Sequence, residues 1–229
     1  MKSFLDTADF VEIERYLKLG IIDGITTNPV ILKKAGMTNP LEAWKKIIEL
    51  IKTHTINPLS LSAEVFTDDA GEMFEQAVSF YEELQYPGLA IKIPILGLDG
   101  KPRYEVIENL ANRGIKVNCT ACITKNQACA AAASGATFVS LLYRRIIDEF
   151  DKKMDFGRWM IAETRDWLDQ KKLKAEIIVG SIREPNDVYR AAQAGAHIVT
   201  IPPQHMLFHQ KSVDTQREFL EAAGALPKA

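Results

Sequence analysis

A lysine lies within the most apolar strand-like run of this chain, residues 89–95. Pro87-Gly88 and Gly97 bound the run, whose length and composition are typical of a short buried strand. Moving an ammonium group out of water is costly unless the group finds a partner or loses its proton. A neutral lysine amine is a nucleophile for carbonyl carbons. Lys92 is therefore either a catalytic nucleophile or a lysine on the exposed face of an edge strand.

Polar side chains also end most of the other strand-like runs. A single case such as Glu64 is more often a solvated strand end than a catalytic group. Side chains that converge on one rim of a parallel barrel are better explained as an active site. The set that would converge there with Lys92 is Asp6, Thr26, Thr27, Asn28, Glu64, Asn118, Thr120, Ser140, Arg145, Ser181 and Arg183.

The residue types at these positions suggest Schiff-base chemistry. Lys92 would attack the carbonyl of a ketose, and the resulting cationic imine would accept electrons from a breaking C–C bond. Asp6 is the candidate general acid/base for the hydroxyl proton. Glu64 and Thr120, joined through a water, would transfer protons while the imine forms. Uncharged side chains would bind the substrate: Thr26, Asn28, Asn118 and Ser140.

The other side of the rim resembles an anion site. Ser181 and Arg183 precede a helical pattern, so a hydroxyl, a guanidinium and backbone N–H groups would point the same way. Arg145 would close this site from the preceding unit. The alternative for Arg183 is a surface ion pair with an acid of the following helix, Glu184 or Asp187.

These residues are positioned by apolar runs that alternate with helical patterns eight times. The strand-like runs span residues 3–7, 24–27, 61–65, 89–93, 116–120, 138–142, 176–181 and 198–201. The helical patterns span residues 9–19, 40–54, 68–84, 103–113, 125–134, 156–171, 184–194 and 203–209, and three of them follow the capping residues Asn39, Thr67 and Thr124. Strict alternation predicts parallel strands with right-handed crossovers, here an α/β fold with a single (β/α)8 TIM barrel.

One helical pattern, residues 213–222, is left over after the eighth unit. Its apolar face must be buried on its own barrel or on a neighbouring subunit. There is no linker or low-complexity segment, so residues 1–229 are predicted to form one domain.

Composition excludes several classes of function. The net charge of −2 and the absence of a basic tract argue against a nucleic-acid partner. No apolar stretch approaches the roughly 20 residues of a membrane helix, and the N-terminus lacks a signal-peptide pattern. Three cysteines favour a reducing compartment, the cytoplasm. Cys119 and Cys122 form a Cys-x-x-Cys pattern without a second ligand pair, so neither a metal nor a cofactor is expected.

Four motifs resemble the transaldolase family: residues 4–9 (FLDTAD), 24–29 (GITTNP), 91–94 (IKIP) and 180–183 (GSIR). The resemblance runs from residue 3 to about residue 205, and the short chain resembles the compact branch that includes fructose-6-phosphate aldolase. It implies that Lys92 forms the Schiff base, Asp6 is the acid/base and Asn28 contacts the substrate. It also implies a phosphate site of Arg145, Ser181 and Arg183, and pentamers or decamers in which the terminal helix reaches a neighbouring subunit.

Two positions bear on which branch of the family applies. Glu64 stands where transaldolases typically have glutamate and fructose-6-phosphate aldolases have glutamine. Leu142 stands where the family usually has phenylalanine or tyrosine, and Leu141 replaces the usual proline. Leucine cannot hold a water as a tyrosine hydroxyl can, which argues against the aldolase type. It also predicts a wider pocket for a longer ketose or one with a sulfonate in place of the phosphate.

The sequence therefore predicts a class I transaldolase that moves a dihydroxyacetone unit from a ketose phosphate to an aldose. One alternative is an aldolase that releases free dihydroxyacetone. Another is a barrel that binds sugar phosphates without catalysis. A pyridoxal-phosphate Schiff base would also use a lysine and a phosphate site, although no residue is a clear partner for the pyridine nitrogen.

Overall fold

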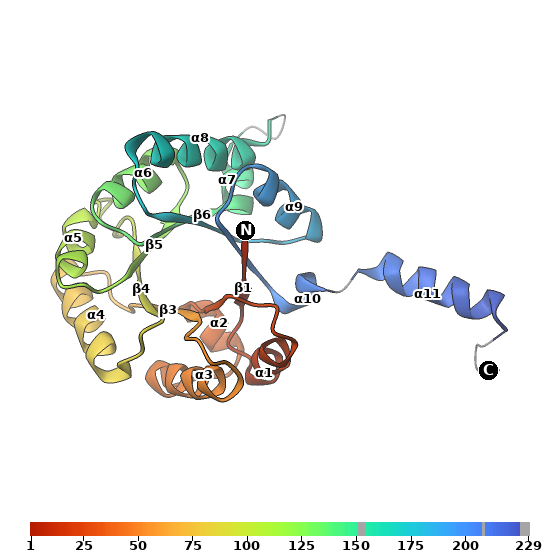
Figure 1. The fold of residues 1–229 in the computed structure, drawn as a ribbon. Coiled ribbons are helices and arrows are strands. Elements are labelled where there is room, and N and C mark those ends of the chain that lie inside the picture. Colours follow the sequence, from red (N-terminus) through yellow and green to blue (C-terminus); the bar gives the residue numbers. More distant parts are fainter. Residues whose placement is uncertain (151–153, 208, 225–229) are drawn as a thin grey trace.

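The computed structural model describes residues 1–150, 154–207 and 209–224. Eight parallel strands form a closed barrel in which each strand pairs with the next and β8 pairs with β1. Helices surround the barrel on its outer side (Figure 1). This architecture confirms the predicted (β/α)8 fold. The strands are β1 (Lys2–Asp6), β2 (Gly24–Thr26), β3 (Ser60–Glu64), β4 (Leu89–Pro94), β5 (Val117–Cys122), β6 (Phe138–Leu142), β7 (Glu176–Gly180) and β8 (Ile198–Ile201).

Two short helices at the barrel rim were not predicted, α2 (Pro29–Lys34) and α7 (Tyr143–Glu149). They directly follow β2 and β6, so these two units each contain two helices. The other helices are α1 (Phe10–Leu19), α3 (Pro40–His54), α4 (Ala70–Leu84), α5 (Tyr104–Asn112), α6 (Lys125–Ala133), α8 (Phe156–Lys171), α9 (Pro185–Gln193), α10 (Pro203–Met206) and α11 (Gln210–Ala222). The predicted bounds of α3 and α8 are confirmed, and the others differ at one or both ends.

Side-chain caps explain where several helices begin. Asn39 and Thr124 cap α3 and α6 as predicted. The prediction for Thr67 is wrong, because the carboxylate of Asp69 accepts the first N–H groups of α4 while the Thr67 hydroxyl donates to Glu72. Three glycines that follow helices have positive φ angles, as is typical of helix C-termini: Gly114, Gly135 and Gly195.

The barrel interior has an apolar layer and a polar layer. Phe4 and Phe138 come from strands that are not neighbours, yet their rings lie 6.4 Å apart, so they meet inside the barrel. A Cβ at Gly24 would come within 2.7 Å of the Phe4 ring, which explains the glycine there. Side chains alternate along a strand, and the next inward residues are polar and buried: Thr26, Ser62, Asn118, Ser140 and Thr200. The apolar layer thus forms a floor beneath a polar layer at the carboxyl ends of the strands.

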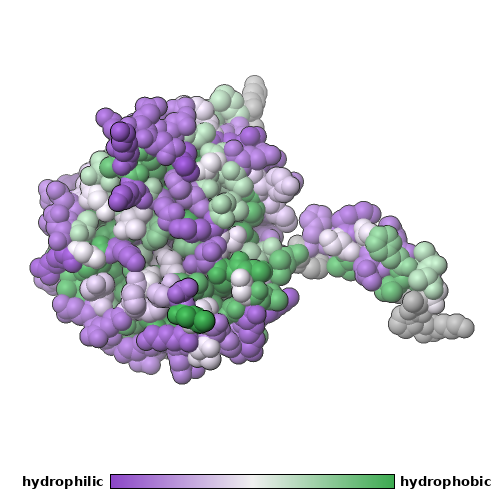
Figure 2. Space-filling model, in the orientation of Figure 1, coloured by the Kyte–Doolittle hydropathy of each residue, from purple (hydrophilic) through white to green (hydrophobic). Residues whose placement is uncertain are grey.

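The terminal helix α11 extends away from the barrel (Figure 1) and has no buried residue. Val213 and Phe219 on this helix are 41% and 65% exposed. Figure 2 shows apolar surface on α11 and on the part of the barrel next to it. Across the described ranges, no helix is both long and apolar enough to span a membrane.

Candidate active site

Strand register brings the predicted catalytic residues to one end of the barrel. Glu64 on β3 lies opposite Lys92 on β4, and Lys92 lies opposite Asn118 on β5. On the other side, Asp6 at the end of β1 lies opposite Thr26 on β2. Because all strands are parallel, these side chains share the carboxyl-terminal rim, where barrels of this kind carry their chemistry.

Lys92 is buried and paired. Its side chain is on the wall of a closed barrel, so the alternative of an exposed edge strand is wrong. The Lys92 Nζ lies 2.7 Å from Glu64 Oε2 and donates a hydrogen bond to the Thr27 carbonyl oxygen at 2.9 Å. Glu64 therefore contacts the lysine directly. Thr120 is buried on β5 opposite Pro94, farther along the same rim.

Asp6 lies in an environment that favours its protonated form. Burial raises the pKa of this carboxyl above its usual range, and the charge of Glu64 adds a smaller increase. The hydrogen bond from the Thr26 hydroxyl, at 2.7 Å, and the charge of Lys92 lower the pKa without cancelling the effect of burial. A carboxyl with a raised pKa can exchange its proton closer to neutral pH, as a general acid/base must.

The predicted substrate-binding amides are fixed by hydrogen bonds. Ser140 donates to Asn118 Oδ1 at 2.7 Å, and Asn118 Nδ2 donates to Ser62 Oγ at 3.1 Å. Asn28 caps α2, because its Oδ1 accepts the Ile31 backbone N–H at 2.9 Å. The Asn28 amide nitrogen is then its remaining donor toward a ligand.

The predicted anion site is divided between α7 and the turn after β7. Arg145 is exposed on α7, and Ser181 follows β7 with a left-handed φ of 60°. Arg183 is also exposed, and its Nη2 lies 2.7 Å from Asp148 Oδ2 on α7. The predicted alternative named the wrong acids, because the ion-pair partner of Arg183 is Asp148.

Sequence reasoning missed a buried carboxylate beneath this turn. Asp187 on α9 is fully buried, and its Oδ2 accepts the backbone N–H groups of Arg183 and Glu184 at 2.9 and 3.2 Å. Arg144 Nε donates to the same oxygen at 2.7 Å. The signal was available, since an acid at the third position of a helix is typical of a capping box. Also missed were the buried hydroxyls of Ser62 and Thr200, which occupy polar positions within apolar strands. Thr27, which the sequence placed at the rim, is buried, and its hydroxyl donates to the Ser62 carbonyl.

Leu142 lies at the end of β6, next to the strand that leads into the anion site. Leu142 lies opposite Gly180 in the β6–β7 register. A Cβ at Gly180 would lie 3.5 Å from Leu142 Cδ2, an ordinary contact distance. A Cβ at position 180 would thus touch Leu142 without a clash, and the wider pocket predicted from Leu142 stays a prediction.

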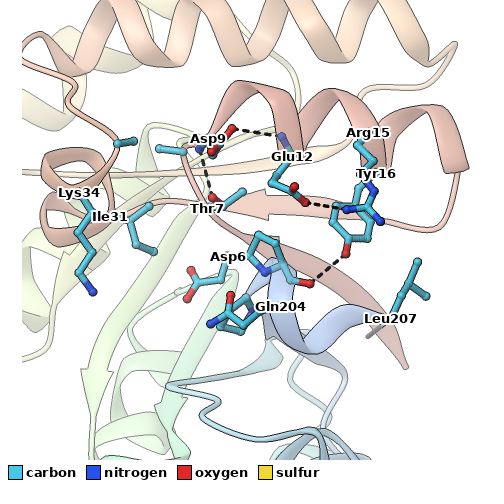
Figure 3. A pocket seen from close by; sticks show the side chains of 14 residues that line it. Asp6, Thr7, Asp9, Glu12, Arg15, Tyr16, Ile31, Lys34, Gln204 and Leu207 are labelled. Atoms are coloured by element: carbon cyan, nitrogen blue, oxygen red, sulfur yellow. Dashed lines mark hydrogen bonds and ion pairs between the residues drawn. The ribbon is translucent and has the colours of Figure 1, made fainter. Parts of the chain in front are cut away.

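A groove of about 840 Å³ borders Asp6 on the other side of the mouth, between α1, α2 and α10. Figure 3 shows Asp6 next to Gln204, with Ile31 and Lys34 on the α2 side. The groove does not include Lys92. Its polar and apolar lining gives access to the acid/base candidate from outside the barrel.

The Cys-x-x-Cys residues lie buried within the barrel wall. The Sγ atoms of Cys119 and Cys122 are 3.8 Å apart, and both thiols are free. A hydrogen bond with Cys122, together with burial, raises the pKa of Cys119, unlike a reactive cysteine. No cluster of metal-ligating side chains occurs among the residues described here.

Comparisons with known proteins agree with this geometry. The sequence model of the family Transaldolase/Fructose-6-phosphate aldolase matches residues 3–226. The chain is 37% identical over 203 residues to a probable transaldolase of Cereibacter sphaeroides, which covers 89% of this chain and 85% of the relative. It is 35% identical over 212 residues to a probable transaldolase of Symbiobacterium thermophilum, with 92% and 88% of the two chains covered. From its barrel, its rim and these matches, the chain belongs to the transaldolase/fructose-6-phosphate aldolase family.

Proposed function

We propose that the protein is a Schiff-base transaldolase that moves a dihydroxyacetone unit from an anionic ketose to an aldose. The observation that carries the proposal is the buried Lys92, which lies 2.7 Å from Glu64 on the same rim as Asp6. The names of the relatives, probable transaldolase, support the same reaction. The presence of glutamate at position 64 also favours the transferase over the aldolase.

The ion pair provides a route to a nucleophilic amine. Transfer of a proton from the Lys92 ammonium to the Glu64 carboxylate would leave a neutral amine and a neutral acid. The amine attacks C2 of the ketose, and the carbinolamine loses water to give a protonated imine. Glu64 and Thr120 are the groups that we assign to the proton transfers of this dehydration.

Cleavage then needs one base. The Asp6 carboxylate takes the proton of the C4 hydroxyl, the C3–C4 bond breaks, and its electron pair neutralises the imine as an enamine. The first aldose leaves. The enamine carbon attacks the carbonyl of the second aldose, Asp6 returns the proton, and water hydrolyses the new imine. The groups that we assign to holding the sugar hydroxyls in register are Thr26, Asn28, Asn118 and Ser140.

The donor would carry its anion toward Arg145, Ser181 and Arg183. An incoming phosphate or sulfonate would compete with Asp148 for Arg183, whose ion pair is solvent-exposed and hence weak. Leu142 and Gly180 lie opposite each other next to this site, and Leu142 stands where the family usually has an aromatic residue. We therefore include longer ketoses and a sulfonated ketose among the donors to be tested.

We also propose a location and an assembly for the protein. The three buried free thiols favour a cytoplasmic location. We infer that residues 1–229 act as one domain and that α11 packs on a neighbouring subunit of a homo-oligomer, a pentamer or a decamer. The exposed apolar residues of α11 support this packing.

Borohydride trapping tests the Schiff base directly. The protein is incubated with fructose 6-phosphate, with a seven-carbon ketose phosphate, or with a sulfonated fructose, and is then reduced. Intact mass and peptide mapping should locate a covalent sugar adduct on Lys92. The variant Lys92→Met should give no adduct. The matched control Lys116→Met should still react, because Lys116 is exposed and donates to the Pro87 carbonyl far from the rim.

The pattern of adducts distinguishes the alternatives. An adduct with the longer or sulfonated ketose alone would assign Leu142 to donor selection. Free dihydroxyacetone formed without an acceptor would favour the aldolase. An absence of adduct with all three ketoses would contradict the proposal and favour a non-catalytic binding barrel.

A further inference from the structure

A chain of hydrogen bonds crosses the barrel interior next to Asp6. Thr26 Oγ1 lies 2.7 Å from Asp6 Oδ1 and 2.5 Å from Thr200 Oγ1. Thr26 is on β2 and Thr200 is on β8, the two strands that flank β1. Both threonines are buried, with 3% and 5% of their surface exposed. Their side chains therefore meet on the inner side of β1, over the strand that carries Asp6.

Each threonine hydroxyl has a single proton to donate, and this fixes the direction of the hydrogen bonds. An ionised carboxylate only accepts hydrogen bonds, so Thr26 must use its single proton on Asp6. The short contact between the two hydroxyls then requires Thr200 to donate to Thr26. Without Thr200, the Thr26 oxygen would lose its donor, and only the bond to Asp6 would hold the hydroxyl in place.

We propose that Thr200 is a positioning residue for catalysis, which acts through Thr26 to orient the Asp6 carboxylate. The inference rests on the proposed function, since it assumes that Asp6 is the acid/base. Consecutive hydrogen bonds polarise one another, so the bond from Thr200 strengthens the bond that Thr26 makes to Asp6. Thr200 itself does not contact the substrate in this proposal.

The surroundings of Asp6 make this hydrogen bond important. The charged groups that face Asp6 are Lys92 from β4 and Glu64 from β3, and they act in opposite directions. Burial raises the pKa of Asp6, and the bond from Thr26 is the largest influence that lowers it. A weaker bond from Thr26 would therefore reduce the fraction of ionised Asp6 at a given pH below neutral.

The substitution Thr200→Val tests the role, because valine has nearly the same shape but no hydroxyl. We expect kcat to fall about tenfold, a part of what general acid/base catalysis supplies, with KM changed by less than about twofold. The acidic limb of the rate profile should move to higher pH. Thr200→Ser should restore both the rate and the profile. The matched control Thr164→Val removes another buried hydroxyl, one that donates to the Met160 carbonyl on α8, and should leave the profile unchanged.

Several outcomes would overturn the inference. One is a Thr200→Val enzyme with the wild-type pH profile, whatever its thermal stability. Another is a Thr200→Ser enzyme as slow as the valine variant, which would indicate a packing role. Wild-type turnover with an unaffected valine variant contradicts this inference alone. Absence of wild-type turnover and of Lys92 trapping contradicts the proposed function, and the inference with it.

Discussion

At the scale of a single residue, we expect Asp6 to lower the stability of the folded protein at neutral pH while it supports turnover. Its pKa is raised in the folded protein, chiefly by burial. Linkage then makes its contribution to folding favourable below the unfolded aspartate pKa of about 3.9, and that contribution is lost as the pH rises through the folded pKa. At neutral pH the ionised carboxylate is thus a cost to stability. We expect Asp6→Asn to unfold at a higher temperature near pH 7 and to turn over about 10²–10⁴-fold more slowly.

Thermal melts at two pH values measure this effect. The stability gain of Asp6→Asn should shrink as the pH is lowered toward about 4. At that pH the side chain at position 6 is uncharged in the folded wild type as well as in the variant. Asp169→Asn is a suitable control, because Asp169 is exposed and its ion-pair partner among the described residues is Arg165 on the same helix. A variant that melts below the wild type near pH 7 would show that the hydrogen bond from Thr26 outweighs burial.

Residue types at strand ends were predictable, but their partners were not. Lys92, Glu64 and Asp6 stood out because charge is rare at the end of an apolar strand. The direct pairing of Glu64 with Lys92 depends on the register of β3 against β4, which the sequence does not state. Thr200 was missed because a threonine within a strand run is equally typical of ordinary β-structure.

At the scale of an element, the turn from β7 into α9 depends on Asp187. This buried carboxylate holds two N–H groups of the turn and the Arg144 guanidinium. Replacement by alanine would leave the two N–H groups without their acceptor, and Arg144 would keep only its pairing with Glu184 among the described residues. We expect Asp187→Ala to lower the free energy of unfolding by about 3 kcal/mol and to raise KM for the anionic donor more than it lowers kcat.

Urea unfolding and steady-state kinetics check the two parts separately. Asp166→Ala on the exposed face of α8 is the control and should change stability by less than about 0.5 kcal/mol. If Asp187→Ala were destabilised with an unchanged KM, Asp187 would support the barrel without shaping the anion site.

Helices were predictable where they are long enough to show several periods, and strands where a short run is continuously apolar. The strands β6 and β8 and the helices α3 and α8 have the bounds that periodicity gives. The helices α2 and α7 were missed because six or seven residues are too few to show a helical period. Both lie at the rim, so the omission concealed why Asn28 is fixed as a cap and why Asp148 faces Arg183.

At the scale of the whole molecule, the barrel and the terminal helix obey different constraints. The alternation of eight units leaves one closed solution for the barrel, with no sheet edge. The sequence shows that the last helix has an apolar side, but the surface that covers this side lies outside the barrel and is not specified by the sequence pattern. In the structure α11 leaves the barrel and none of its residues is buried. Such a helix is stable when its apolar residues pack on another surface.

A charge on the apolar side of α11 should therefore weaken assembly. Phe219 is 65% exposed, and we expect Phe219→Asp to shift the protein toward smaller species in sedimentation velocity, because a carboxylate would have to be buried on the neighbouring subunit. Ile56→Asp is the matched control, since Ile56 is fully exposed in the turn between α3 and β3. The barrel itself should remain folded, because α11 adds nothing to its core. An unchanged sedimentation profile for Phe219→Asp would place α11 outside the interface, and assembly would then have to depend on the barrel surface alone.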